Sequence, residues 1–430
     1  MAIWGRYLAP RLGHPPHQIV KMTPLSNETK NTPLEGIRVL DLCVVLAGPT
    51  CGRTLAQYGA EVIKVDPAHR PPQLTPWMDV GRGKRSISLN LMKPGGLETF
   101  LQLADSADVI LEGFRKGVAD RLGIGYETIK ELNPGIVYGS INCFGQEGPW
   151  DMRPGFEQNA QAATGIQLRN AGVTNISTFG TSRPRPATFT LNDYGTGISA
   201  AFAVMLALLE RKKTGSGQRI EAALSYTSAL ITGPYHVDYE GFQREDIGGP
   251  GARGIGALNR LYECSDGWLL LSVSGSTELN ALKATSYFSG IPESPSCDDL
   301  QSIFSGKSTS EWETILTKAG VPAVRNTSAE ELHADPSNRK RHLVRSRDYC
   351  SASNDDSINT GDCKGDPSWG ISTWPGNPVN MSESNLVDVQ PPLFGADTDD
   401  VLIEAGLSLD DLKRLRSAGA IPANLPIPLH

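Results

Sequence analysis

The sequence predicts an α/β protein with a Rossmann-like, doubly wound parallel sheet in its large domain and a smaller α+β domain. In the first half of the chain, short apolar runs alternate with segments of helical spacing, a pattern typical of a parallel sheet covered by helices. The 430 residues are also enough to bury one large core and to form a second domain.

Five short apolar runs are expected to be the strands of this sheet. In chain order they are residues 37–42, 61–66, 86–91, 108–114 and 136–142. Helical spacing occurs between and after them, in residues 51–58, 94–104, 126–132 and 198–213. Gly59 is expected to close the first helix, and a turn at 214–217 to end the last.

A glycine-rich loop at 248–256 suggests a boundary before the smaller domain. Residues 260–273 beyond it resemble a β-hairpin whose turn is Ser265-Asp266-Gly267. Helical segments follow at 278–285 and 310–319. A hairpin followed by helices predicts an α+β unit.

Two segments differ from the rest in composition. Residues 1–33 are basic and proline-rich with no acid before Glu28, which predicts a disordered N-terminal extension. A transit peptide and a true start at Met22 are the alternatives. Residues 351–382 are polar and weakly periodic and are expected to be a surface excursion, after which order resumes at 391–412.

Composition also excludes several functional classes. A formal charge of −7 argues against nucleic acid as the main partner, and no apolar stretch is long enough to span a bilayer. The seven cysteines are scattered and contain no CxxC pair, which favours reduced thiols over disulfides or a metal site. We therefore expect a cytoplasmic protein without a metal, with a mitochondrial location as the alternative.

A nicotinamide-binding function is tested by the first β-α-β unit and is disfavoured. Asp66 ends the second expected strand, where a dinucleotide fold places its ribose-binding acid. The turn after the first strand, however, lacks the GxGxxG pattern, and Pro49 removes an N–H that a pyrophosphate would use. Cys51, which follows this turn, is interpreted as a core residue, although a helix start would favour a thiolate.

Asp193 is the most informative single residue of the chain. It is followed by Gly195 and Gly197 and precedes a long helical segment. Glycines allow a ligand to approach the backbone, and a helix N-terminus favours negative charge. Two interpretations fit this local pattern: an N-cap aspartate and a reactive carboxylate.

Several motifs follow one another in order between about residues 34 and 412: 34–42 (LEGIRVLDL), 47–49 (AGP), 55–64 (LAQYGAEVIK), 83–87 (GKRSI), 120–123 (DRLG), 153–157 (RPGFE), 192–197 (NDYGTG), 213–218 (KTGSGQ) and 392–395 (PLFG). Together they resemble the class III CoA-transferase family (CaiB/BaiF type), which includes formyl-CoA transferase, carnitine CoA-transferase and α-methylacyl-CoA racemase. Each motif is weak by itself, but their order is specific.

The resemblance implies covalent catalysis in which Asp193 is acylated and then carries coenzyme A as a thioester, with Glu157 beside it. Backbone N–H groups of residues 195–197 or of the 248–256 loop are candidates for stabilising the oxyanion. CoA and acyl-CoA are then substrates, and no permanently bound cofactor is expected. The residues expected to contact CoA are Ala47, Lys84, Arg85, Phe114, Arg121, Arg153 and Phe156, with Arg115 and Lys116 as further cations.

Three departures from the family pattern bear on the reaction. Phe156 stands where the racemases have a catalytic histidine, so racemisation is disfavoured. Leu46 and Gly113 replace a glutamine and an asparagine of formyl-CoA transferase, so an apolar or larger acyl group is expected in place of formate or oxalate. The leading hypothesis is an acyl-CoA:carboxylate CoA-transferase, and the alternatives are a lyase or isomerase and a catalytically silent acyl-CoA-binding homologue.

The resemblance further implies an interlocked homodimer whose large domain takes residues from both ends of the chain. The expected large, Rossmann-like CoA-binding domain comprises residues 34–231 and 351–430, and the small domain comprises residues 257–325. Residues 232–256 and 326–350 are expected to link the two as extended crossings.

Overall fold

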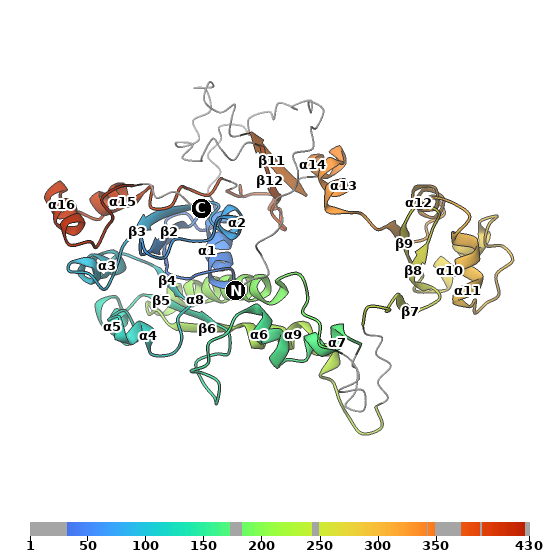
Figure 1. Ribbon diagram of the computed structural model, residues 1–430, viewed down its shortest axis with the longest axis horizontal. Helices are drawn as coiled ribbons and strands as arrows, with labels where there is room; N and C mark the ends of the chain where they lie inside the picture. The colour runs from blue at the N-terminus through green and yellow to red at the C-terminus, as the bar shows by residue number, and fades with distance from the viewer. Residues whose placement is uncertain are drawn as a thin grey trace.

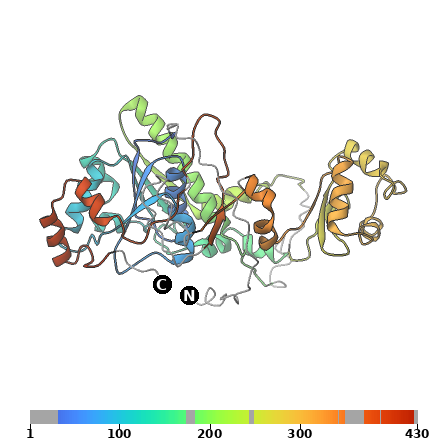
Figure 2. The same ribbon diagram turned by 90° about the horizontal axis from the view of Figure 1, so that it is seen from above.

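The computed structural model describes residues 32–172, 183–242, 249–341, 343–348, 371–387 and 389–425. The chain forms a larger lobe around a parallel sheet and a smaller lobe that stands apart from it in both views (Figures 1 and 2). The predicted N-terminal extension up to residue 31 and most of the predicted excursion, residues 351–370, lie outside the described residues. No helix among the described residues is long and apolar enough to cross a membrane.

Six parallel strands form the main sheet in the order β3-β2-β1-β4-β5-β6. They are β1 (Arg38–Asp41), β2 (Glu61–Asp66), β3 (Lys84–Ser88), β4 (Val109–Glu112), β5 (Val137–Asn142) and β6 (Arg219–Ala223). The strand order reverses between β1 and β4, which is where α/β sheets bind their ligands. The five predicted strands are confirmed, and the sixth was missed because β6 alternates between exposed and partly buried residues and lacks an apolar run.

Helices cover both faces of this sheet, as its alternating side chains require. On one face Val39, Val62 and Val109 pack under α1 (Ala47–Gln57) and α8 (Leu191–Thr214). On the other face the next residues, including Leu40 and Ile63, pack under four further helices. These are α3 (Gly96–Asp105), α5 (Tyr126–Leu132), α15 (Thr398–Glu404) and α16 (Leu409–Ser417). The doubly wound prediction is therefore confirmed.

The C-terminal helices return to the sheet edge formed early in the chain. Asp397 accepts a hydrogen bond from the backbone N–H of Ser86 at 2.8 Å, and the Thr398 hydroxyl accepts one from Ser88 N–H at 2.9 Å. Both ends of the described chain thus complete one core. The remaining helices of this lobe are short: α2 (Leu74–Val80), α4 (Val118–Arg121), α6 (Glu157–Ala163), α7 (Ile166–Asn170), α9 (Leu224–Ile231) and the 3₁₀ turn η2 (Gly233–Tyr235).

The smaller lobe is a four-stranded antiparallel sheet with its own core. Its order is β10-β9-β8-β7, formed by β7 (Gly254–Gly256), β8 (Asn259–Glu263), β9 (Trp268–Ser272) and β10 (Ala323–Arg325). The predicted hairpin is confirmed as the β8–β9 pair. Three helices pack on one face around Phe288, Phe304 and Trp312: α10 (Ser276–Ala284), α11 (Cys297–Phe304), which was not predicted, and α12 (Thr309–Lys318).

The connection after residue 325 differs from the extended crossing that the sequence predicts. It contains α13 (Ala329–Ala334), α14 (Pro336–Lys340) and β11 (Val344–Asp348), which pairs with β12 (Ile371–Pro375). Two caps start these helices, because Ser328 accepts from Glu331 N–H and Asp335 accepts from Ser337 N–H. Part of the other crossing, residues 243–248, lies outside the described residues.

Candidate active site

Asp193 is the third residue of α8, which begins seven residues earlier than the sequence predicts. The N-cap interpretation is therefore wrong, because Thr190 occupies that position. The glycines that obscured the helix are required by packing: a Cβ at Gly197 would come within 2.4 Å of the Ala47 carbonyl oxygen. The close contact of α1 with α8 thus explains glycine inside a helix, where it is otherwise unfavourable. It also places the N–H groups of 195–197 inside the helix, so they are not candidates for an oxyanion.

Glu157 lies directly behind Asp193 and holds the first turn of α8. One carboxylate oxygen, Oε2, accepts the backbone N–H of Asp193 at 2.8 Å, and the other, Oε1, accepts the side-chain amides of Asn192 at 3.0 Å and Gln161 at 2.8 Å. The first N–H groups of a helix lack partners within the helix, and this carboxylate satisfies them. Glu157 is buried and is not among the residues that line the pocket described below.

The environment of Asp193 disfavours its charged form. Burial raises its pKa to about 7, and the neighbouring charge of Glu157 adds to the shift. Among the described residues, none donates a hydrogen bond to the Asp193 carboxylate. A carboxylate that is poorly solvated and unpaired retains its nucleophilicity once it is ionised.

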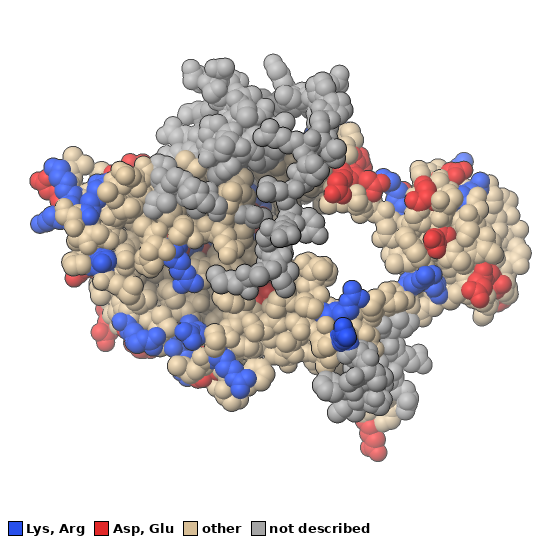
Figure 3. Space-filling model, in the orientation of Figure 1, with Lys and Arg blue, Asp and Glu red and all other residues tan. Residues whose placement is uncertain are grey.

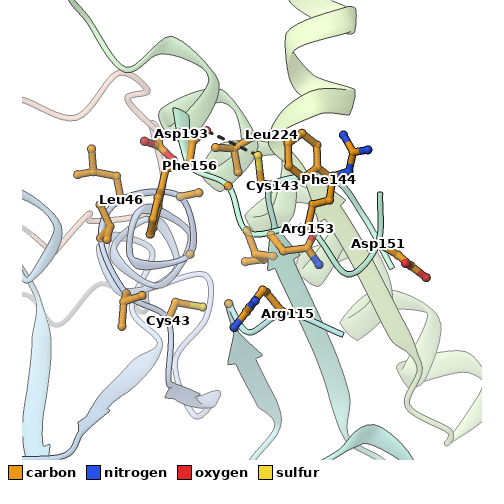
Figure 4. Close-up of a pocket in the computed structure, with 18 residues that line it drawn as sticks. Cys43, Leu46, Arg115, Cys143, Phe144, Asp151, Arg153, Phe156, Asp193 and Leu224 are labelled. Carbon is orange, nitrogen blue, oxygen red and sulfur yellow. Dashed lines mark hydrogen bonds between the residues drawn. The ribbon is translucent and has the colours of Figure 1, made fainter. Parts of the chain in front are cut away.

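A pocket opens beside Asp193 at the carboxyl ends of β1, β4 and β5, where the strand order reverses. Figure 4 shows Asp193 and Cys143 gathered at one end of it and Arg115 at the other. Apolar side chains form much of the wall, including Leu46, Phe156 and Leu224. The remaining lining residues are Cys43, Val44, Val45, Ala47, Gly48, Gly113, Ile141, Asn142, Phe144, Asp151, Arg153 and Gly155.

The loop between β1 and α1 has an unusual backbone at this pocket. Val45 has a φ of 68°, and no other non-glycine residue in the described ranges has a positive φ. A β-branched residue in this region is a genuine outlier, and such strain concentrates at functional sites. The turn aims the start of α1 at the pocket, where Ala47 and Gly48 are among the lining residues.

The structure brings together only part of the predicted set. Ala47, Arg153, Phe156 and Asp193 line the pocket, and so does Arg115. Phe114 packs against the core between the sheet and α3, α5, α15 and α16, on the face that α1 and α8 do not cover, and it is not among the lining residues. Arg121 is exposed in α4 and is not among the lining residues.

Lys84 and Arg85 differ from the free cations that the sequence predicts. The Lys84 side chain is fully buried, with its ammonium 2.7 Å from an Asp41 carboxylate oxygen and 2.8 Å from the Pro49 carbonyl oxygen. Arg85 is paired with Glu61 at 2.7 Å and with Glu404 at 2.6 Å. A buried charge needs such a partner, so in this chain Lys84 serves the core between β1, β3 and α1.

Asp66, at the position where a dinucleotide fold places its ribose-binding acid, is also paired with a side chain of the protein itself. Asp66 is buried, and its carboxylate is 2.6 Å from the Lys64 ammonium. Pro49 and Cys51 both lie inside α1, and Cys51 is fully buried as predicted. The described residues contain no cluster of three or more potential metal ligands, and the cysteines described are all free.

Sequence reasoning missed three parts of the pocket wall: Val45, Cys143 and the aromatic cluster beside Arg153. The rings of Phe144 and Trp150 meet edge to face with their centroids 5.2 Å apart, and the Arg153 guanidinium carbon lies 4.5 Å from the Trp150 ring centroid. Burial, followed by the charge of Asp193, raises the pKa of Cys143 to about 12, so this thiol stays neutral. No local sequence signal identifies these neighbours, because they come from separate strands and loops.

An open α/β sheet with a pocket and a buried carboxylate at its switch point is typical of ligand-binding α/β proteins, and sequence comparison identifies the family. Residues 34–398 match CoA-transferase family III. The chain belongs to this family, whose members use CoA thioesters as substrates.

Curated relatives are named as CoA-transferases. The chain is 38% identical to the succinyl-CoA–L-malate CoA-transferase beta subunit of Chloroflexus aurantiacus over a match that covers 46% of this chain and 51% of that protein, so it spans about half of that relative's length. It is 27% identical to human succinyl-CoA:glutarate CoA-transferase, covering 93% and 92% of the two chains. Formyl-CoA:oxalate CoA-transferase of Streptomyces coelicolor is 28% identical, with 90% and 99% covered.

Solved structures show the same fold. A CaiB/BaiF family protein from Brucella suis superposes with a TM-score of 0.70 at 24% identity, covering 87% of this chain and all of that one. Rv3272 from Mycobacterium tuberculosis gives a TM-score of 0.67 at 23% identity, with coverage of 86% and 99%.

Proposed function

We propose that the protein transfers CoA from an acyl-CoA thioester to a free carboxylic acid, with Asp193 as the covalent nucleophile. The observation that carries this proposal is the Asp193 carboxylate itself. It is buried at a pocket on the switch point of the sheet, its pKa is raised to about 7, and its neighbour Glu157 fixes its backbone. Membership of CoA-transferase family III supports the same reaction.

The proposed reaction proceeds in four balanced steps. An Asp193 carboxylate oxygen attacks the thioester carbonyl carbon, and the C–S bond breaks to give a mixed anhydride and CoA thiolate. The thiolate then attacks the Asp193 carboxyl carbon and releases the first acid, leaving an aspartyl-CoA thioester. The acceptor carboxylate attacks this thioester to form a new anhydride and thiolate. Finally the thiolate attacks the acyl carbon, which produces the new acyl-CoA and restores the Asp193 carboxylate.

Each step develops negative charge on an oxygen, and we assign its stabilisation to the N–H groups at the start of α1. Ala47 and Gly48 line the pocket, Leu46 at the N-cap provides no side-chain acceptor, and among the described residues no acceptor is found for the Ala47 and Gly48 N–H groups. Free N–H groups at a helix N-terminus favour a developing oxyanion. Leu46, Phe156 and Leu224 would limit the access of water to the anhydride.

Arg115 and Arg153 are the cations that we assign to the CoA phosphates. Both are exposed side chains of the pocket wall, whereas Lys84 is sequestered by Asp41. Guanidinium groups bind phosphate oxygens through paired hydrogen bonds. The predicted contact of Arg121 with the nucleotide remains a proposal, for a part of CoA that would extend beyond the pocket.

The named relatives make succinyl-CoA the donor to test first, because several are described as succinyl-CoA-dependent transferases. The apolar wall near Asp193 supports an acyl group larger than formyl. Phe156 lines this wall and cannot transfer a proton, so the pocket gives no support to racemisation.

We further propose that the working unit is a homodimer. Along α8, Ile198, Phe202, Leu206 and Leu209 form a stripe of side chains that are each about half exposed. An exposed apolar stripe of this kind supports an interface with a second copy of the chain. In the face shown in Figure 3, an opening separates most of the smaller lobe from the larger one, and a second copy of the chain could pass through it.

Trapping the covalent intermediate tests the function. The protein is incubated with succinyl-CoA and treated with borohydride or hydroxylamine, and the modified residue is located by mass spectrometry. The proposal expects an adduct on Asp193 that disappears when an acceptor acid is added before the trap. A protein that turns over acyl-CoA without any adduct on Asp193 would contradict the transferase mechanism.

A further inference from the structure

The first turn of α8 is held from a second direction, by a cluster that the reaction above does not use. Tyr194, the residue after Asp193, donates its hydroxyl to Asp79 Oδ2 at 2.6 Å. Asp79 lies near the end of α2, a helix that the sequence did not predict.

Asp79 is itself fixed by two arginines. Arg53 Nη1, from α1, lies 2.8 and 2.7 Å from the two Asp79 oxygens, and Arg82 Nη2 donates to Oδ1 at 3.0 Å. Both arginines are largely buried, with relative exposures of 9% and 2%. The Arg53 guanidinium carbon also lies 5.6 Å from the Tyr194 ring centroid. One carboxylate therefore joins α1, α2 and α8.

The pKa shifts of Asp79 and Tyr194 keep each of these two groups in one protonation state. Burial by itself would raise the pKa of Asp79, but Arg53, the Tyr194 hydroxyl and Arg82 outweigh it and hold that pKa below its ordinary value. Burial, followed by the charge of Asp79, raises the pKa of Tyr194. Asp79 is thus an anionic acceptor and Tyr194 a neutral donor, which makes their short bond a charge-assisted one.

The first turn of α8 needs such anchors more than most helix starts. Its N–H groups have no partners within the helix, and Gly195 and Gly197 follow it directly without side chains that could pack against neighbouring elements. Glu157 holds this turn from one side, through the backbone N–H of Asp193 and the side-chain amide of Asn192. The Tyr194 side chain adds a contact from another side, to Asp79 of α2, so the turn that carries Asp193 is held from two directions.

We propose that Tyr194 and Asp79 are positioning residues for the Asp193 carboxylate, with Arg53 holding Asp79 in place. The inference rests on the proposed role of Asp193 as nucleophile. Misplacement of a reacting group by about 1 Å costs roughly 100-fold in rate. Loss of the Tyr194–Asp79 bond is therefore expected to lower kcat about 10- to 100-fold and to leave the KM for acyl-CoA within about 2-fold.

Tyr194→Phe is the most direct test, because it removes one hydroxyl and keeps the aromatic ring. Tyr138→Phe is the matched control: the buried Tyr138 hydroxyl donates to the Ile124 carbonyl oxygen at 2.9 Å, on the opposite face of the sheet. Single-turnover formation of the Asp193 adduct, steady-state kcat and KM, and thermal melting are measured for both full-length variants. The expected result is slow adduct formation only in Tyr194→Phe, with comparable melting temperatures.

Asp79→Asn gives a second, independent measurement. It is expected to slow adduct formation at least as much as Tyr194→Phe, because it weakens the bond from Tyr194 and also removes the charge that pairs with Arg53 and Arg82. The double variant is expected to lose less than the sum of the two single losses, because the two changes act on the same contact. Wild-type rates in Tyr194→Phe, equal losses in Tyr194→Phe and Tyr138→Phe, or additive losses in the double variant would each overturn the inference. Absence of an adduct in the wild-type protein would instead overturn the proposed function, so the two failures are distinguishable.

Discussion

Glu157 and Asp193 share one buried site, in which Glu157 Oε2 accepts the backbone N–H of Asp193 at 2.8 Å while its negative charge helps to raise the pKa of Asp193 to about 7. The same carboxylate therefore fixes the position of its neighbour and disfavours its ionisation. This gives Glu157 a physical role that differs from direct contact with substrate. It also makes the Asp193 nucleophile sensitive to pH in the neutral range.

Replacement of Asp193 is expected to abolish transfer. Asp193→Asn and Asp193→Ala should lower kcat by a factor on the order of 10³ or more, because neither side chain can form the anhydride. Binding of CoA, measured by calorimetry, should persist because the arginines of the pocket are unchanged. Turnover close to wild type in either variant would remove Asp193 from the nucleophile role.

The pH dependence of the reaction should follow the Asp193 carboxylate. Since only its ionised form attacks, adduct formation is expected to rise with a midpoint near pH 7. Glu157→Gln removes the neighbouring charge and should shift the midpoint to lower pH. Single-turnover rates between about pH 5.5 and pH 8.5 check this, and an unchanged midpoint in Glu157→Gln would exclude electrostatic coupling between the two residues.

Arg115 and Arg153 should determine affinity for CoA. Arg115→Gln and Arg153→Gln are each expected to weaken CoA binding about 5- to 50-fold and to reduce its sensitivity to salt, because an ion pair with phosphate is screened. Lys318→Gln, at an exposed position of α12 in the smaller lobe, is the control for a general change of charge. Wild-type affinity for CoA in both arginine variants would contradict the assignment of Arg115 and Arg153 to the CoA phosphates.

Lys84 should matter for stability more than for ligand binding. Lys84→Met leaves the buried Asp41 carboxylate without its partner, which is expected to lower the free energy of unfolding by about 3–5 kcal/mol. Urea denaturation measures this loss, and the double variant Asp41→Asn/Lys84→Met should recover part of it. A stable Lys84→Met protein with weak CoA binding would restore the role that the sequence predicts.

The proposed dimer is expected to depend on the apolar stripe of α8. Phe202, at 59% exposure, would be buried in such an interface, so Phe202→Glu should favour monomers or unfolded chains. Native mass spectrometry at nanomolar concentration measures the assembly state. A folded, fully active wild-type monomer would contradict the proposal.

Much of the larger lobe could be predicted because its signals are local. The first five strands are short apolar runs, and glycine in the left-handed conformation ends α8 at Gly215. The hairpin of the smaller lobe follows from its turn residues. The start of α8 could not be predicted, because Gly197 reads as a helix breaker until the close approach of Ala47 explains it.

The sequence by itself determined the alternation of strands and helices, the importance of Asp193 and the resemblance to the CoA-transferase family. Only the tertiary structure decided which charged groups are free to bind a ligand. Lys84 is paired with a residue 43 positions away and Arg85 with one 319 positions away, while Arg115 and Arg153 meet at one pocket. Local patterns depend on near neighbours in the chain, whereas the pairing and burial of a charge depend on residues that only folding brings together.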